Sequence, residues 1–197
     1  MPGTLPIETG IEALRVRSID PTLTSDDNAN GDYVRKVGAQ RWAFTIRWPK
    51  LSHQEVRQVM AFINTQRGAF HTFEVVMPVL SDPQGAASGT PLVDGAGQTG
   101  NAINTRGWTP SITVLMAGDK VRFNGHSKVY EVTADALSDG TGLAALALYP
   151  PLMASPADGE ALTVTDVPFT VRASNKDREF NIRANDNTLA LDVVEAL

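Results

Sequence analysis

The sequence contains no cysteine, and it has few histidines. Without cysteine the chain has no disulfide bonds, no thiolate nucleophile and no thiolate metal ligand. The three histidines, His53, His71 and His126, are far apart, and none has another histidine two to four residues away. Because metal-binding and catalytic motifs usually bring such residues together at short spacing, the sequence predicts neither a metal site nor a catalytic histidine.

Long apolar runs and an excess of basic residues are also missing. No apolar run approaches the roughly 20 residues that a membrane-spanning helix needs, so we expect no membrane insertion. The first residues show neither a basic segment nor an apolar segment of the kind found in signal peptides. The formal net charge is −5, from 17 Lys and Arg against 22 Asp and Glu. An acidic chain gains little from counterion release, which argues against nucleic acid as the main partner.

The residues that are present predict a mainly β protein with one helix. Apolar and polar residues alternate over 14–19 and over 41–48, the period of a half-buried strand. Ser52 and Glu55 form a capping-box pattern just before apolar residues at helical spacing, Val56, Val59, Met60 and Ile63. This pattern predicts a helix over 52–66 whose apolar stripe docks on a sheet.

Residues 81–110 are rich in glycine and proline, and we interpret them as a linker. Gly95, Gly97 and Gly100 match the G-x-G-x-x-G spacing of dinucleotide-binding loops. That fingerprint needs a preceding strand and a following helix, and turn-forming residues follow here instead. The match is therefore a coincidence within a glycine-rich segment, and we expect no cofactor.

The remaining pattern predicts an inserted domain. Residues 111–172 contain five or six short alternating segments separated by turns, which is typical of a small β-barrel, OB-like or SH3-like. Residues 173–197 show the same alternation of apolar and polar residues as the N-terminal part, around 180–182 and 189–193. We therefore predict a discontinuous β-sandwich domain with one helix, 1–80 plus 173–197, and a separate barrel, 111–172.

Two groups of residues are candidates for contacts between subunits. Arg15 and Arg17 lie on the polar face of a predicted strand, and Asp26 and Asp27 lie in a predicted acidic loop. These charges either face solvent or pair with opposite charges on a neighbouring subunit. Trp108, beside glycine and proline, is the best candidate for an exposed aromatic residue at a domain or subunit contact.

Other aromatic residues share one strand face, Trp42, Phe44 and Trp48. Such a row forms either a platform for stacking sugars or bases or part of a core, and we favour the core. A carbohydrate-binding module on a virion or cell surface remains the alternative function. Exposure of Trp108 and Tyr130 on one concave face would favour it.

Several segments resemble tail proteins of long-tailed phages, and the layout most resembles the siphophage distal tail protein family. The resemblance is carried by segments 37–48, 67–73, 89–93, 97–101, 107–110, 117–121, 129–135 and 149–151. It implies a non-enzymatic structural protein of the virion tail that assembles as a homo-oligomer, a hexameric ring. The ring would connect the tail tube to the tail tip, hub or baseplate, and the family offers no catalytic residues to transfer.

Overall fold

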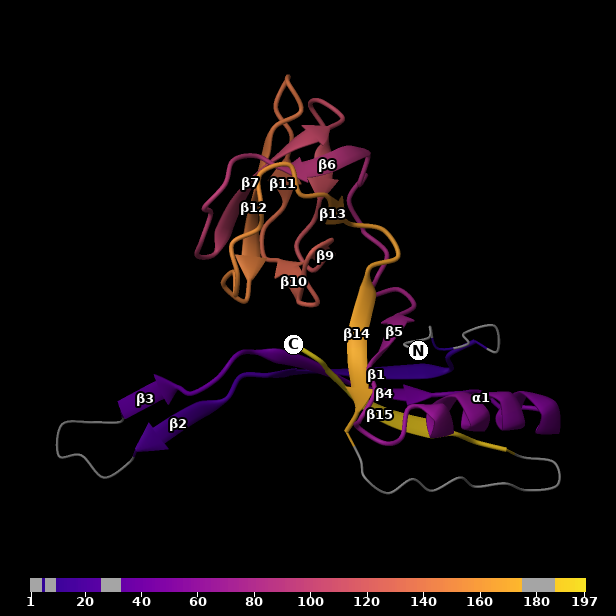
Figure 1. Cartoon of the computed structure of the whole chain (residues 1–197). Helices are drawn as coiled ribbons and strands as arrows, with labels where there is room; N and C mark the ends of the chain where they lie inside the picture. The colour runs from indigo at the N-terminus through magenta and orange to yellow at the C-terminus, as the bar shows by residue number, and fades with distance from the viewer. Residues whose placement is uncertain (1–4, 6–9, 26–32, 175–186) are drawn as a thin grey trace. The chain divides into compact units, whose positions relative to one another are not determined.

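The computed structural model describes residues 5, 10–25, 33–174 and 187–197 (Figure 1). Its contacts divide the chain into two compact units, which we call the sheet unit and the barrel unit. The sheet unit comprises Leu5–Thr72 and Val171–Ala196, and the barrel unit is built around Phe73–Thr170. The predicted fold class, mainly β with one helix and a small barrel, is confirmed. The predicted domain boundaries stay a prediction.

A five-stranded sheet has the order β1-β4-β15-β14-β5. Its strands are β1 (Ala13–Ile19), β4 (Arg41–Arg47), β15 (Ala190–Glu195), β14 (Pro168–Ala173) and β5 (Phe73–Val76). β1, β4, β15 and the second half of β14 lie in the sheet unit, whereas β5 and the first half of β14 fall within Phe73–Thr170. β4 lies between β1 and β15 and is antiparallel to both. A separate two-stranded hairpin is formed by β2 (Thr22–Ser25) and β3 (Tyr33–Lys36).

The strand register explains which face of this sheet is buried. Directly paired residues lie on the same face, and Phe44 is paired with Val16 on β1 and Val193 on β15. Phe44, Trp42 and Trp48 are all buried. The interpretation of this aromatic row as core is therefore confirmed.

The helix forms where the capping pattern predicts it. α1 spans His53–Thr65, one residue shorter at each end than expected. The Glu55 backbone N–H donates to Ser52 Oγ at 3.3 Å, and the Ser52 N–H donates to Glu55 Oε2 at 2.7 Å. Val56, Val59 and Ile63 are buried, whereas Met60 is only half-buried. Because an apolar helix stripe and an apolar sheet face each need a partner, we infer that they pack together.

The barrel unit contains a six-stranded sheet with the order β13-β9-β10-β12-β7-β6 and a small β11-β8 pair. At the two ends of the sheet, Leu92 on β6 bridges to Ala161, and the Val93 N–H donates to the Glu160 carbonyl at 2.9 Å. The sheet is thus nearly closed around an apolar core. The strands are β6 (Gly89–Val93), β7 (Ala102–Trp108), β8 (Thr113–Leu115), β9 (Lys120–Phe123), β10 (Val129–Val132), β11 (Ala136–Leu137), β12 (Ala144–Tyr149) and β13 (Leu162–Thr163).

The interpretation of 81–110 as a linker is wrong, because β6 and β7 lie inside it and pair with each other. The glycines mark turns and close approaches of backbone. Gly89 and Gly107 have positive φ, and a Cβ atom on Gly107 would collide with the Thr90 carbonyl oxygen. Glycine here permits tight strand pairing, which composition alone does not distinguish from flexibility.

β14 crosses the boundary predicted between the barrel at 111–172 and the sandwich segment at 173–197. Val171, Arg172 and Ala173 pair with β15 in the five-stranded sheet. Alternating apolar residues predict a strand, but they do not specify which sheet it joins. The strand predicted around 180–182 lies outside the described residues.

Candidate interaction surface

The residues that the structure describes contain no cluster of three or more His, Asp or Glu side chains able to hold a metal ion. Within the same residues, no helix has the length and apolar character to cross a membrane. His126 Nε2 lies 3.7 Å from Glu160 Oε2, and His53 Nδ1 lies 3.5 Å from Asn187 Nδ2. Glu160 also accepts backbone N–H bonds, including one from Gly125 at 2.7 Å. The contacts thus join His126 to the loop that precedes β13 and His53, at the start of α1, to Asn187.

Charged side chains on the barrel surface also hold loops together. Arg106 Nη1 lies 2.8 Å from Asp94 Oδ1 and 3.0 Å from Asp158 Oδ1. The hydrogen bond to Asp94 is the main cause that raises the pKa of Arg106. The Gly95 N–H donates to Asp158 and lowers the pKa of that carboxyl. The arrangement joins the loops that precede β7 and β13 and has the features of a structural ion pair.

Asp139 fixes the turn between β11 and β12. Its Oδ1 atom accepts hydrogen bonds from the backbone N–H groups of Leu143 and Thr141 at 2.9 and 2.8 Å, and from the Thr141 hydroxyl. The Leu143 bond is the largest of the causes that lower the pKa of Asp139 below its ordinary value of 3.8. Since the folded state has the lower pKa, the carboxylate stabilises the protein above about pH 4, and this contribution is lost as the pH falls through the folded pKa.

We therefore expect the Asp139→Asn variant to lose less of its free energy of unfolding than the wild-type protein when the pH is lowered. Asparagine keeps the shape and one oxygen acceptor but does not titrate. Urea unfolding measured from pH 7 down to pH 3 checks this, with Asp135→Asn as a control because the Asp135 carboxylate accepts only the Ala117 N–H. If the free energy of unfolding of Asp139→Asn depends on pH as that of the wild-type protein does, then protonation of Asp139 does not contribute to the loss of stability in acid.

The expectation that Trp108 is exposed is wrong. Its side chain is 3 % exposed within the barrel core, and its Nε1–H donates to Thr105 Oγ1 at 2.7 Å. Tyr130 is fully buried, and its hydroxyl accepts the Met153 N–H at 3.1 Å. A surface hollow of about 260 Å³ on the barrel is lined by no aromatic residue. The aromatic platform on which the carbohydrate-binding alternative depended is therefore not present in these residues.

Arg15 and Arg17 are exposed on β1, as the alternation indicates. Arg15 pairs with Thr45 and Arg17 with Ala43, so both lie on the sheet face opposite Phe44. The register places three further arginines on the same face, Arg41, Arg47 and Arg172. We call these five residues the arginine face. Among the described residues no ion pair joins any of them to an acidic side chain, while Asp26 and Asp27 lie outside those residues.

The hairpin of β2 and β3 was not predicted from the sequence. All eight of its strand residues are exposed. They include Leu23, Tyr33 and Val34, each more than 60 % exposed, and Val37 just beyond β3 is 56 % exposed. The sequence signal was the short β-branched and aromatic run 33–37, which lies beside a polar loop and is too brief to stand out.

Comparison with known proteins gives one family match. Residues 81–167 match the family described as distal tail protein pb9, B domain. No curated protein matches the sequence of the chain. The matched segment covers β6 to β13, which build the nearly closed six-stranded sheet and the separate β11-β8 pair.

The match at 81–167, which contains the nearly closed sheet, supports a structural component of a phage tail. Over residues 81–167 the chain is similar to a domain of the distal tail protein family, which supports the resemblance found in the sequence.

Proposed function

We propose that the chain is a subunit of a hexameric ring at the distal end of the phage tail, where the ring connects the tail tube to the tail tip or baseplate. The observation that carries this proposal is the match of the barrel segment to the B domain of a distal tail protein. In this role the protein acts by binding its neighbours, and it performs no catalysis.

The sheet unit offers surfaces of the kind that a ring needs. A closed ring is built from head-to-tail contacts, so each subunit must present two different and complementary surfaces. The arginine face supplies a basic surface with Arg15 and Arg17 near the free edge of β1, the outermost strand of the sheet. Asp26 and Asp27 of the next subunit supply the acidic counterpart in this proposal.

The partners beyond the ring are other tail proteins, namely the tail tube on one side and the tail tip or hub on the other. The chain's net charge of −5 favours protein partners over nucleic acid. Its location in this role is the virion tail.

The proposal is tested in tails of the phage that encodes the chain. We expect mass spectrometry to detect the protein in purified tails, and electron cryomicroscopy to show its density in a six-fold ring between tube and tip. Absence from the tails, or density without cyclic contacts, would contradict the proposal. A complementation test checks the proposal that the arginine face forms a contact between subunits. The double variant Arg15→Glu, Arg17→Glu should fail to enter tails, whereas Arg57→Glu, an exposed change on α1, should enter them normally.

A further inference from the structure

The charge of the chain is divided unequally between its two units. Residues 73–170, all of which the structure describes, carry four Lys and Arg and ten Asp and Glu, a formal charge of −6. The segments of the sheet unit, 5–72 and 171–196, carry 13 basic and 12 acidic residues, a formal charge of +1. The barrel unit therefore has an excess of acidic groups that its own cations do not offset.

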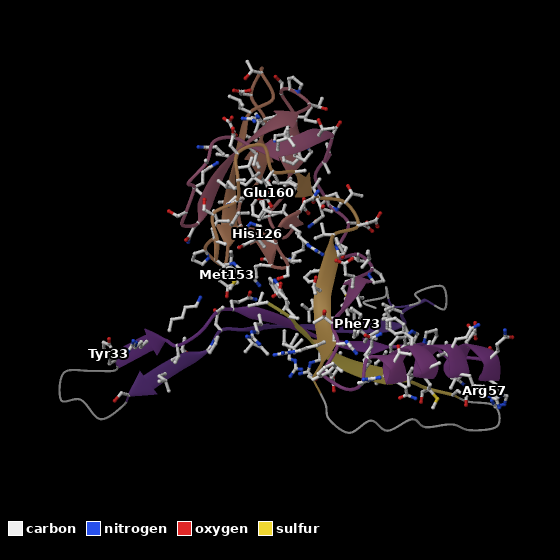
Figure 2. The ribbon with its side chains drawn as sticks, viewed as in Figure 1. Tyr33, Arg57, Phe73, His126, Met153 and Glu160 are labelled. Atoms are coloured by element: carbon white, nitrogen blue, oxygen red, sulfur yellow. The ribbon has the colours of Figure 1, made fainter. Side chains whose placement is uncertain are left out.

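Part of this excess lies on exposed side chains that are not neutralised within the unit. Lysine, arginine or histidine pairs with five of the carboxylates, and Figure 2 shows one such pair, His126 and Glu160. The five are Glu74, Asp94, Glu131, Asp158 and Glu160. Asp119 is buried and accepts backbone N–H groups. The other four are exposed, and no ion pair joins them to a described residue: Asp82, Asp135, Asp139 and Asp166.

Two of these four carboxylates lie on one short strip of the barrel surface. Asp135, Leu137 and Asp139 are exposed, whereas Ala136 and Ser138 between them are buried, because side chains of an extended segment alternate in direction. Leu137 is 67 % exposed. We call the three exposed residues the acidic strip. It presents two negative charges on either side of an apolar side chain.

The hollow beside the acidic strip suits an arginine side chain. The lining of this hollow of about 260 Å³ includes Asp139 and two exposed leucines, Leu137 and Leu143. Asp139 Oδ1 binds the turn, whereas Oδ2 accepts no hydrogen bond from a residue that the structure describes. Leucine side chains beside a carboxylate oxygen match the apolar stem and the guanidinium head of arginine.

The arginine face is the matching basic surface in the chain. The four strands that carry its five arginines place one acidic residue on the same face, Asp192, which pairs with Thr45. Asp192 and all three acidic residues of the loop between β2 and β3, Asp26, Asp27 and Asp32, supply four negative charges for five guanidinium groups. Positive charge therefore remains on the arginine face even when that loop of the next subunit is counted.

We propose that the acidic strip binds the arginine face of a second copy of this chain, as a further contact between neighbouring ring subunits. The inference rests on the proposed function, because a head-to-tail ring brings different surfaces of two copies together. Charge complementarity supports this occupant, since a unit of charge −6 and a face with five arginines belong to the same chain.

Crosslinking identifies the occupant directly. The full-length chain carries a photoreactive p-benzoylphenylalanine in place of Leu137, and is irradiated both as concentrated purified protein and in assembled tails. We expect crosslinked dimers of the chain, with mass spectrometry locating the second attachment site on β1 or β4 of the other copy. Attachment elsewhere in the other copy, crosslinks in tails to a different tail protein alone, or no dimer in tails would overturn the inference. A dimer in tails without one in purified protein still supports it.

Charge reversal in the crosslinking chain then tests the pairing of the two surfaces. Asp135→Lys, and separately the double variant Arg17→Glu, Arg47→Glu, should each lower the yield of dimer about tenfold. Mixing the two variants should restore it, because each supplies the surface that the other lacks. Asp82→Lys is the matched control, since it changes an exposed carboxylate of the barrel unit by the same charge, and it should leave the yield unchanged. Equal losses in Asp82→Lys and Asp135→Lys, or no recovery on mixing, would contradict the pairing.

These results separate the inference from the proposed function. If the protein forms a ring in tails but residue 137 crosslinks only to another tail protein, the second contact is wrong and the ring stands. If the protein is absent from tails while purified copies crosslink from residue 137 to β1 or β4, the contact between copies stands and the tail role fails.

Discussion

Gly107→Ala should lower the free energy of unfolding of the barrel unit by roughly 2–5 kcal/mol, the sum of two effects. Gly107 on β7 has φ +87°, a conformation that costs a residue with a Cβ atom about 1–2 kcal/mol. The added Cβ would also collide with the backbone carbonyl of Thr90 on β6. Backbone cannot move aside as a flexible side chain can, so the two strands must separate. Such overpacking typically costs about 1–3 kcal/mol.

Gly97→Ala separates these two effects. Gly97 also has positive φ, +75°, but nothing lies within 4 Å of a Cβ built on it. Its substitution should show only the conformational cost, about 1–2 kcal/mol. Hydrogen exchange resolved by peptide measures the stability of each unit separately. Equal losses in the two variants would show that the close approach of β6 and β7 is not what requires glycine at 107.

Phe44→Ala should cost about 3–5 kcal/mol and destabilise the sheet unit. The Phe44 ring is fully buried on the central part of β4, between Val16 on β1 and Val193 on β15. Its removal leaves a cavity that three strands and the helix stripe cannot close without losing their register. We expect faster hydrogen exchange throughout β1, β4 and β15, and a lower melting temperature.

Arg47→Ala is the matched control on the same strand. Arg47 is exposed on the opposite face and makes no ion pair with a described residue, so its truncation should change stability by less than about 0.5 kcal/mol. A comparable loss in both variants would mean that the faces of β4 are assigned wrongly.

The candidate surface was only partly predictable. Arg15 and Arg17 were correctly placed on an exposed strand face, because alternation fixes the face of a strand once its partner face is apolar. Trp108 was placed wrongly. Its flanking glycine and proline indicate a turn, but Gly107 instead permits close strand pairing, and Thr105 satisfies the buried indole N–H. The hairpin of β2 and β3 escaped prediction because neither of its faces is buried and no periodic pattern marks it.

The sequence by itself determined the local features of this protein. The helix is specified by the Ser52 and Glu55 capping box and by an apolar stripe, both of which act within one or two turns. The alternation of β4 specifies its buried face in the same local way, and the absence of cysteine rules out disulfide bonds. These features can be predicted without knowing which segments of the chain contact one another.

The tertiary structure alone decided which strands pair with which. β14 joins β15 although the chain between them is long, and β6 and β7 join the barrel sheet from a segment that composition marks as a linker. Strand pairing depends on hydrogen bonds and side-chain contacts between segments distant in sequence, and a strand's own pattern is compatible with many partners. The five arginines likewise become one face only when β1, β4, β15 and β14 are set side by side in register.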